Sequence, residues 1–301
     1  MFKKKIIVIC GPTASGKTEI SLSLAKKLNT EIIAADSMNV YRGLNIGTAK
    51  PSESERREVK HHLIDVVSPL ESFSVGDYKE NAKPIVDGLL NEFKIPIICG
   101  GTGFYINSVL YDFSYGKVKC DIVVRQKYLK MADEKGADAV YQVLVDKDPF
   151  AAKTLHPNDV KRVVRALEIC ENGIKKSDIK DELRPVYDYS AYALDFERED
   201  LYERIDKRVD NMVSNGLIAE VESLIENGVN ENCQCMQGIG YKEIYEYLKN
   251  GISLDEAIEK IKLNTRHYAK RQITFFKRLP RLIWLKPDTV DTITERIVNE
   301  I

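Results

Sequence analysis

The chain has 301 residues, of which 44% are hydrophobic and 30% charged, a composition typical of folded globular proteins. Its net charge of −1 excludes a surface that attracts nucleic acid as a whole, so such a partner has to be argued from local clusters. The six cysteines lack the Cys-x-x-Cys spacing of a zinc or redox site, and no apolar run reaches the roughly 18 residues of a membrane span. We therefore expect a cytoplasmic protein of about two domains, with reduced cysteines and no membrane partner.

The first predicted elements are a strand, a phosphate-binding loop and a helix. The β-branched run 6–9 leads into Gly-x-x-x-x-Gly-Lys-Thr, and residues 19–28 have helical composition and spacing. Such a loop points successive N–H groups at one anion, at the positive end of the helix dipole. Lys17 adds a cation for the terminal phosphate, and the Thr18 hydroxyl is placed to bind Mg²⁺. The pattern predicts a diphosphate or triphosphate ligand on Gly11, Pro12, Thr13, Ala14, Ser15, Gly16, Lys17 and Thr18, without specifying the reaction.

Two further predicted strands end on polar side chains. Residues 31–35 form a buried-strand run that ends on Asp36, at the sheet edge where ligands of parallel α/β proteins bind. Three roles are open for Asp36: a second Mg²⁺ contact, a general base, and a cap of the next turn. Residues 95–99 lead into Gly100-Gly101-Thr102, where the turn either presents the Thr102 hydroxyl to a ligand or only avoids backbone strain.

The segments between and after these strands predict the rest of the architecture. We expect a short strand at 63–67 that is entered by two histidines, and a helix over 73–93. From about 111 onwards the pattern changes to amphipathic helices, and a strand at 191–196 returns the chain to the sheet. The predicted organisation is a core formed by 1–112, a helical insertion over 113–190, and the rest of the core with basic helices over 191–301. Basic residues gather in the insertion at Lys117, Lys119, Arg125, Lys127, Lys130, Lys161, Arg162 and Arg165.

The densest basic stretch of the chain is 265–278. On a helix, three basic residues of this stretch and one lysine before it fall within roughly 40° of one azimuth. They form a stripe without interleaved acids. We define this basic stripe as Lys262, Arg266, Lys270 and Lys277. It is either a solvated face or a surface that contacts a phosphate backbone.

At this point the sequence resembles the tRNA dimethylallyltransferases. The resemblance rests on motifs that come in order over nearly the whole chain: 11–18, 36–43, 46–51, 100–102, 156–159 with Arg162 and Arg165, 203–208, 238–242 and 270–272. It implies a P-loop NTPase-like α/β fold, a parallel sheet with a helical insertion. It also implies transfer of a dimethylallyl group from dimethylallyl diphosphate to N6 of the adenosine immediately 3′ of the anticodon in tRNA, with Mg²⁺. We expect a monomer, because no coiled-coil pattern or large apolar patch is evident in the sequence.

The resemblance assigns roles to particular residues. Asp36 matches the general base that accepts a proton from N6, Thr102 faces the bridging oxygen of the leaving diphosphate, and Lys17 and Arg208 neutralise that group. Positions that contact tRNA in the family match Asp36, Ser37, Met38, Asn39, Thr102, Arg125, Lys161, Arg162, Val163, Val164, Arg165, Gln237, Gly238, Ile239, Gly240, Tyr241, Lys242 and Arg271.

Three other functions compete with this one. A small-molecule P-loop kinase explains the loop and an inserted lid, but not the 100–102 turn or the basic stripe. An isopentenyltransferase of free adenine nucleotides shares the catalytic residues but needs neither the insertion nor the stripe. An RNA-binding module without catalysis does not explain why Lys17, Thr18, Asp36 and Thr102 are all present.

Overall fold

The computed structural model describes residues 5–113, 121–179 and 184–301. Its centre is a six-stranded sheet in the order β3-β2-β4-β1-β5-β6, and every strand pair described is parallel. The sheet confirms the predicted α/β class with a parallel core. The strands are β1 (Lys5–Cys10), β2 (Ile32–Ala34), β3 (His61–His62), β4 (Ile97–Cys99), β5 (Asp188–Leu194) and β6 (Leu282–Leu285).

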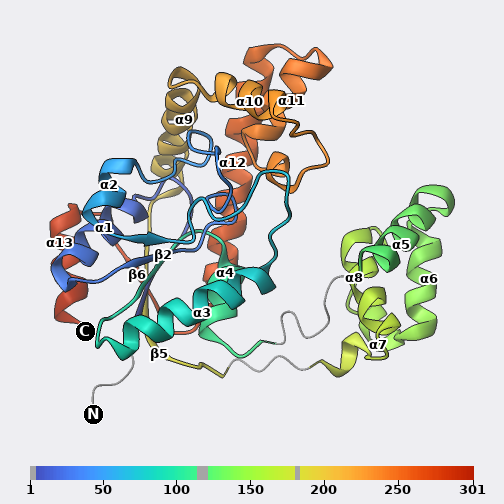
Figure 1. Ribbon diagram of the computed structural model, residues 1–301, viewed down its shortest axis with the longest axis horizontal. Coiled ribbons are helices and arrows are strands. Elements are labelled where there is room, and N and C mark those ends of the chain that lie inside the picture. The colour runs from blue at the N-terminus through green and yellow to red at the C-terminus, as the bar shows by residue number, and fades with distance from the viewer. Residues whose placement is uncertain (1–4, 114–120, 180–183) are drawn as a thin grey trace. The chain divides into compact units, whose positions relative to one another are not determined.

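Both faces of this sheet are covered, which explains why β1 is an uninterrupted apolar run instead of an alternating one. Helices α1 and α13 lie side by side on one face and contribute Ile20, Leu24, Ile293 and Ile297 to the core (Figure 1). Right-handed crossovers place α3 and α4 on the other face, because these connections run along the sheet in the opposite direction. The helices around the sheet are α1 (Lys17–Leu28), α2 (Glu53–Glu58), α3 (Val75–Asn91), α4 (Gly103–Leu110), α9 (Arg198–Ser214), α10 (Leu217–Glu226), α11 (Tyr241–Asn250), α12 (Leu254–Phe276) and α13 (Val290–Asn299).

The predicted strand at 63–67 is absent. Strand β3 consists of the two histidines, and the chain then turns because Leu63 and Asp65 adopt left-handed φ values of 61° and 58°. A pleated strand cannot pass through such residues. The segment instead pairs locally with the chain that follows β2: the N–H of Val66 donates to the carbonyl of Val40, and Val67 forms an isolated parallel bridge with Tyr41.

The chain divides into two compact units, 1–110 with 185–301, and 111–184. The second unit is helical, with α5 (Ile122–Lys135), α6 (Ala137–Lys147), α7 (Pro149–Ala152) and α8 (Val160–Glu171) around a core that includes Tyr128, Leu144 and Leu167. The predicted boundary at 190 falls inside β5, whose pairing with β1 already begins at Asp188, so the division lies earlier, at 184. Within the described residues, no helix has the length and apolar character needed to cross a membrane.

Candidate active site

The phosphate-binding loop has the predicted form of strand, loop and helix. It leaves β1 at Gly11, whose φ is 118°, and enters α1 after Gly16, whose φ is 86°. Both values favour glycine, because side chains with a Cβ rarely adopt them. Two side chains tie the loop to itself: the hydroxyl of Ser15 donates to the carbonyl of Pro12 at 2.8 Å, and the Lys17 ammonium donates to the same carbonyl. The loop is therefore held in shape by its own residues.

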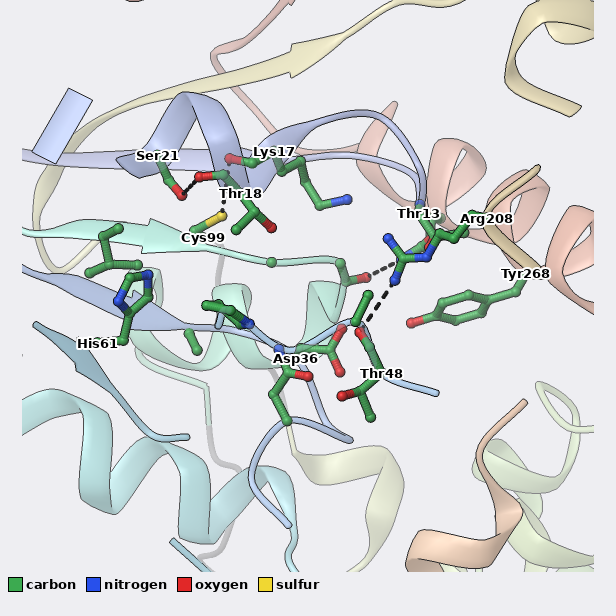
Figure 2. A pocket seen from close by; sticks show the side chains of 18 residues that line it. Thr13, Lys17, Thr18, Ser21, Asp36, Thr48, His61, Cys99, Arg208 and Tyr268 are labelled. Carbon is green, nitrogen blue, oxygen red and sulfur yellow. Dashed lines mark hydrogen bonds between the residues drawn. The ribbon is translucent and has the colours of Figure 1, made fainter. Parts of the chain in front are cut away.

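Two half-buried cations and one carboxylate face each other beside this loop (Figure 2). Burial lowers the pKa of Lys17 to about 8, and the neighbouring Arg208 guanidinium acts in the same direction, whereas Asp36 opposes it. Burial also lowers the pKa of Arg208, again opposed by Asp36. Nη2 of Arg208 donates to the carbonyl of Thr48 at 3.2 Å. This arrangement places positive charge in a cavity that is partly shielded from water, as an anionic leaving group requires.

The carboxyl ends of β2 and β4 meet at the turn 100–102, which we call the second turn. A Cβ on Gly100 would lie 2.1 Å from the carbonyl oxygen of Ala35, so the glycine permits a close backbone approach. Gly100 and Gly101 do not have positive φ, which rules out simple relief of backbone strain as their reason. The Thr102 hydroxyl accepts the N–H of Ser37 at 3.0 Å and so connects the two turns.

Asp36 lies at this junction. Its Oδ1 accepts the N–H of Met38 at 2.9 Å, which is the capping role left open by the sequence. The same carboxylate lines the cavity that Lys17 and Thr18 also line (Figure 2). Capping and a chemical role are therefore compatible, because one carboxylate has more than one lone pair to offer.

Two side chains of α12 complete the site and were missed as functional residues by reasoning from the sequence. Gln272, which is buried, accepts the N–H of Thr13 at 2.8 Å and donates to the carbonyl of Gly101 at 2.9 Å. It therefore clamps the phosphate-binding loop to the second turn. Tyr268 lies beside Asp36 and Thr102, where burial and the Asp36 charge raise the pKa of its hydroxyl. Gln272 lies in the 270–272 motif and Tyr268 in the basic stretch 265–278, but neither pattern identified them as site residues.

Two cavities share a wall at this place. The first, at the phosphate-binding loop, is lined by Lys17, Thr18 and Gly101. The second has a volume of about 310 Å³ and includes the apolar side chains of Met212, Ile239 and Ile261. The side chains that line both are Thr13, Asp36, Thr48, Arg208 and Tyr268. Such a pair of cavities can hold two reactants with a carboxylate and a guanidinium between them.

The oxygens near the loop fit a Mg²⁺ ion. Mg²⁺ in phosphate sites usually takes one or two protein oxygens and completes its shell with phosphate oxygens and water. The Thr18 hydroxyl and the Asp36 carboxylate face the same cavity and provide such oxygens. A cluster of three or more His, Cys, Asp or Glu side chains that could hold a metal without phosphate does not occur among the described residues.

Residues 39–279 match the sequence model of the IPP transferase family. The chain belongs to that family. Residues 4–72 also match the model of the isopentenyl transferases. The chain is 44% identical over 300 residues to the tRNA dimethylallyltransferase of Acetivibrio thermocellus, which covers 98% of this chain and 96% of that protein. It is 45% identical over 301 residues to the enzyme of the same name from Anoxybacillus flavithermus, with 99% and 95% covered.

Solved structures agree with the sequence relatives. The full-length tRNA isopentenylpyrophosphate transferase of Bacillus halodurans has a TM-score of 0.74 at 40% identity, over 99% of this chain and 97% of that chain. A eukaryotic dimethylallyltransferase seen acting on tRNA has a TM-score of 0.84 at 30% identity, over 98% of this chain and 77% of that chain. The resemblance read from the motifs is thereby confirmed, and so is the fold that it implies.

Most of the sheet-unit residues that were predicted to contact tRNA line the second cavity. Its lining includes Ser37, Met38, Gln237, Gly238, Ile239, Tyr241 and Arg271. Arg271 lies over the ring of Tyr268, with 5.8 Å between guanidinium carbon and ring centroid. Asn39 is buried at the first cavity, where its Oδ1 finds no hydrogen-bond partner among the described residues. Gly240 precedes α11, in which Lys242 is exposed.

The matching residues of the helical unit fall into three groups. Lys161 and Arg162 are exposed on α8, and Arg162 lies 3.3 Å from Asp159. Arg125 and Arg165 instead contact the fully buried carboxylate of Glu168, at 2.6 Å and 2.8 Å. The side chains of Val163 and Val164 lie in the core of this unit, so they offer RNA no side-chain contact. Lys117 and Lys119 lie outside the described residues.

The basic stripe on α12 is shorter than the sequence predicted. Lys262 lies 2.8 Å from Asp210, and Arg266 donates to Asp206 through Nε at 3.1 Å. Both acids belong to α9, which packs along α12, so these two positions are paired within the protein although the stripe itself contains no acids. Lys270 and Lys277 are exposed, and neither forms an ion pair in the part of the chain that the structure describes.

Proposed function

We propose that this protein transfers a dimethylallyl group from dimethylallyl diphosphate to N6 of the adenosine immediately 3′ of the anticodon in tRNA and releases diphosphate. The observation that carries the proposal is the pair of cavities that share Asp36, Arg208 and Tyr268. One cavity has the loop and the cations that a diphosphate requires, and the other has apolar and polar side chains suited to a base. The names of the relatives support the same activity.

The residues divide the reaction between them. The diphosphate binds the 11–18 loop, where Lys17 and Arg208 neutralise it, and the Thr18 hydroxyl would hold Mg²⁺. That ion would offset part of the charge on the diphosphate. N6 attacks C1 of the prenyl group while the bond from C1 to the bridging oxygen breaks, and its electron pair leaves with the diphosphate. The proton of N6 passes to the free oxygen of Asp36.

The target base has to leave its stack to reach this place. N6 must approach a carbon that is held next to the phosphate-binding loop, which a base stacked in the anticodon loop cannot do. We infer that the flipped adenine enters the second cavity, with Arg271 and Lys270 near the RNA backbone. Monomeric state and cytoplasmic location stay predictions, and sedimentation of the purified protein tests the first of them.

The test is transfer of radiolabel from dimethylallyl diphosphate to an anticodon stem-loop with adenosine after the anticodon. The matched control is the same stem-loop with guanosine there, and AMP and ATP serve as parallel acceptors. Label on the adenosine stem-loop alone, abolished by EDTA and restored by Mg²⁺, is the expected result. Label on AMP would instead indicate a free-nucleotide transferase, and ATP turnover without any transfer would indicate a kinase.

A further inference from the structure

The carboxylate of Glu220 in α10 accepts four hydrogen bonds from two distant parts of the chain. Its Oε2 accepts the N–H groups of Asn45 and Ile46, both at 2.8 Å. Its Oε1 accepts the N–H of Gly47 at 3.1 Å and the hydroxyl of Tyr241 at 2.6 Å. An ionised carboxylate has about four lone-pair sites and no donor, so it matches four donors without conflict.

The segment held in this way runs over 43–50 and contains no helix or strand. Glu220 fixes its middle, and the buried Lys50 fixes its end by donating to the carbonyl of Tyr41 at 2.7 Å. Tyr241 also presses against it, because a Cβ on Gly47 would lie 2.6 Å from the tyrosine ring. The conformation of this segment therefore depends on contacts from α10 and α11.

The next residue of the segment leads to the reacting groups. The carbonyl of Thr48 accepts Nη2 of Arg208 at 3.2 Å, and Thr48 lines both cavities together with Arg208. Gly47 and Tyr241 line the second cavity. The Glu220 carboxylate thus helps to position Arg208, which faces the leaving group. It also positions the part of the second cavity's wall formed by Gly47 and Tyr241.

We propose that Glu220 is a positioning residue that acts through the 45–48 segment on Arg208, an inference that rests on the proposed function. A glutamine at 220 would keep one acceptor oxygen but turn an amide N–H₂ toward N–H or O–H donors. The segment would lose its anchor, and Arg208 would lose the fixed carbonyl of Thr48. The acceptor-only chemistry of the Glu220 carboxylate is therefore what the site uses.

The first test compares Glu220→Gln with Glu222→Gln. The control makes the same change on the same helix, at an exposed residue. In Glu220→Gln, amide hydrogen exchange of 45–47 should become faster, and single-turnover transfer should fall roughly 10- to 100-fold. Glu222→Gln should change neither. Unchanged exchange of 45–47 in Glu220→Gln would overturn the proposal. If that variant does not fold, Glu220→Asp replaces it, because its shorter side chain cannot reach the 45–47 N–H groups and the Tyr241 hydroxyl at once. It is judged by the same hydrogen exchange and transfer rate.

The second test separates positioning of Arg208 from general weakening of the fold. In an Arg208→Lys background, Glu220→Gln should lower the transfer rate by less than about threefold, because the group it positions is already gone. If the two substitutions instead lower the transfer rate independently, so that their fold-reductions multiply in the double variant, the proposal is overturned. The same cycle is measured on the affinity for inorganic pyrophosphate, which does not depend on transfer. Absence of transfer by the wild type would count against the proposed function alone, and the pyrophosphate cycle would still decide the role of Glu220.

Discussion

At the scale of single residues, one oxygen of Asp36 serves the structure, and the proposed function assigns the other to the chemistry. One oxygen holds the N–H of Met38 at 2.9 Å, and the carboxylate lines the cavity that contains Lys17 and Arg208. An adenine amine is a weak nucleophile, so a base within reach of N6 has a large effect on the rate.

We expect Asp36→Asn to lower single-turnover transfer by about 10²- to 10⁴-fold, the usual contribution of a general base. The amide oxygen still accepts the N–H of Met38, so binding of the anticodon stem-loop should be nearly unchanged. Rapid-quench transfer and a filter-binding titration measure the two quantities. A variant that transfers normally, or one that loses RNA binding, would contradict the role of base.

Lys17 gives the site a dependence on pH. Its pKa of about 8 means that the cation is present below that pH and is lost above it. Because the cation attracts phosphate, affinity for inorganic pyrophosphate should fall as the pH rises from 7 to 9, toward about tenfold per pH unit beyond the pKa. Calorimetry compares the wild type with Lys17→Met, since ionisation of the ligand affects both proteins equally. A parallel pH profile in the two proteins would contradict the assignment.

How far single residues could be predicted from the sequence depends on the distance to their partners. The 11–18 loop is local, and its form was predicted in full. Gln272 acts on Thr13 and Gly101, which lie 259 and 171 positions away, and Glu220 acts on residues 173 to 175 positions away. Periodicity and spacing contain no information about such pairs, because the fold alone brings them together.

At the scale of elements, α12 contributes to both the structure and the site. Its 23 residues follow the Ser253 cap, and Lys262 and Arg266 pair with acids of α9. Its second half supplies Tyr268, Arg271 and Gln272 to the cavities. The sequence predicted the helix and its charges, but the acids that form ion pairs with Lys262 and Arg266 come from another helix. In the same way, the apolar residues of 63–67 suggested a strand that two left-handed residues prevent.

This division predicts different salt effects along one helix. Arg271→Ala should weaken binding of the anticodon stem-loop and reduce the slope of log affinity against log salt by about one unit. Lys262→Ala should leave that slope unchanged, because the lysine already pairs with Asp210 at 2.8 Å. Binding titrations between low and moderate salt measure both slopes. An unaltered slope in Arg271→Ala would make its surface a solvated face.

At the scale of the whole molecule, the two chain segments that flank the helical unit lie next to each other in the sheet unit. The N–H of Val186 donates to the carbonyl of Leu110 at 2.8 Å, and β5 then pairs with β1 from Asp188 onwards. The phosphate-binding loop, the second turn, α12 and both cavities are made of residues of the sheet unit.

We therefore expect a variant in which a short glycine-serine linker replaces 112–184 to fold cooperatively and to bind inorganic pyrophosphate like the full chain. It should bind the anticodon stem-loop much more weakly, because Lys161 and Arg162 are removed. Thermal unfolding and calorimetry check the first statement, and binding titrations check the second. Loss of pyrophosphate binding in a folded variant would show that the sheet unit does not hold the donor site by itself.

The hydrogen bond between Leu110 and Val186 also bears on inheritance. Leu110 and Val186 both belong to the sheet unit and are joined by one hydrogen bond, so the length and sequence of the segment between them can drift or be exchanged without stretching the sheet. Selection can then act on the exposed Lys161 and Arg162 of the helical unit and on the two cavities of the sheet unit in separate portions of the gene. Grafting the helical unit of a distant relative between these two residues accordingly measures how much this unit contributes to the choice of RNA.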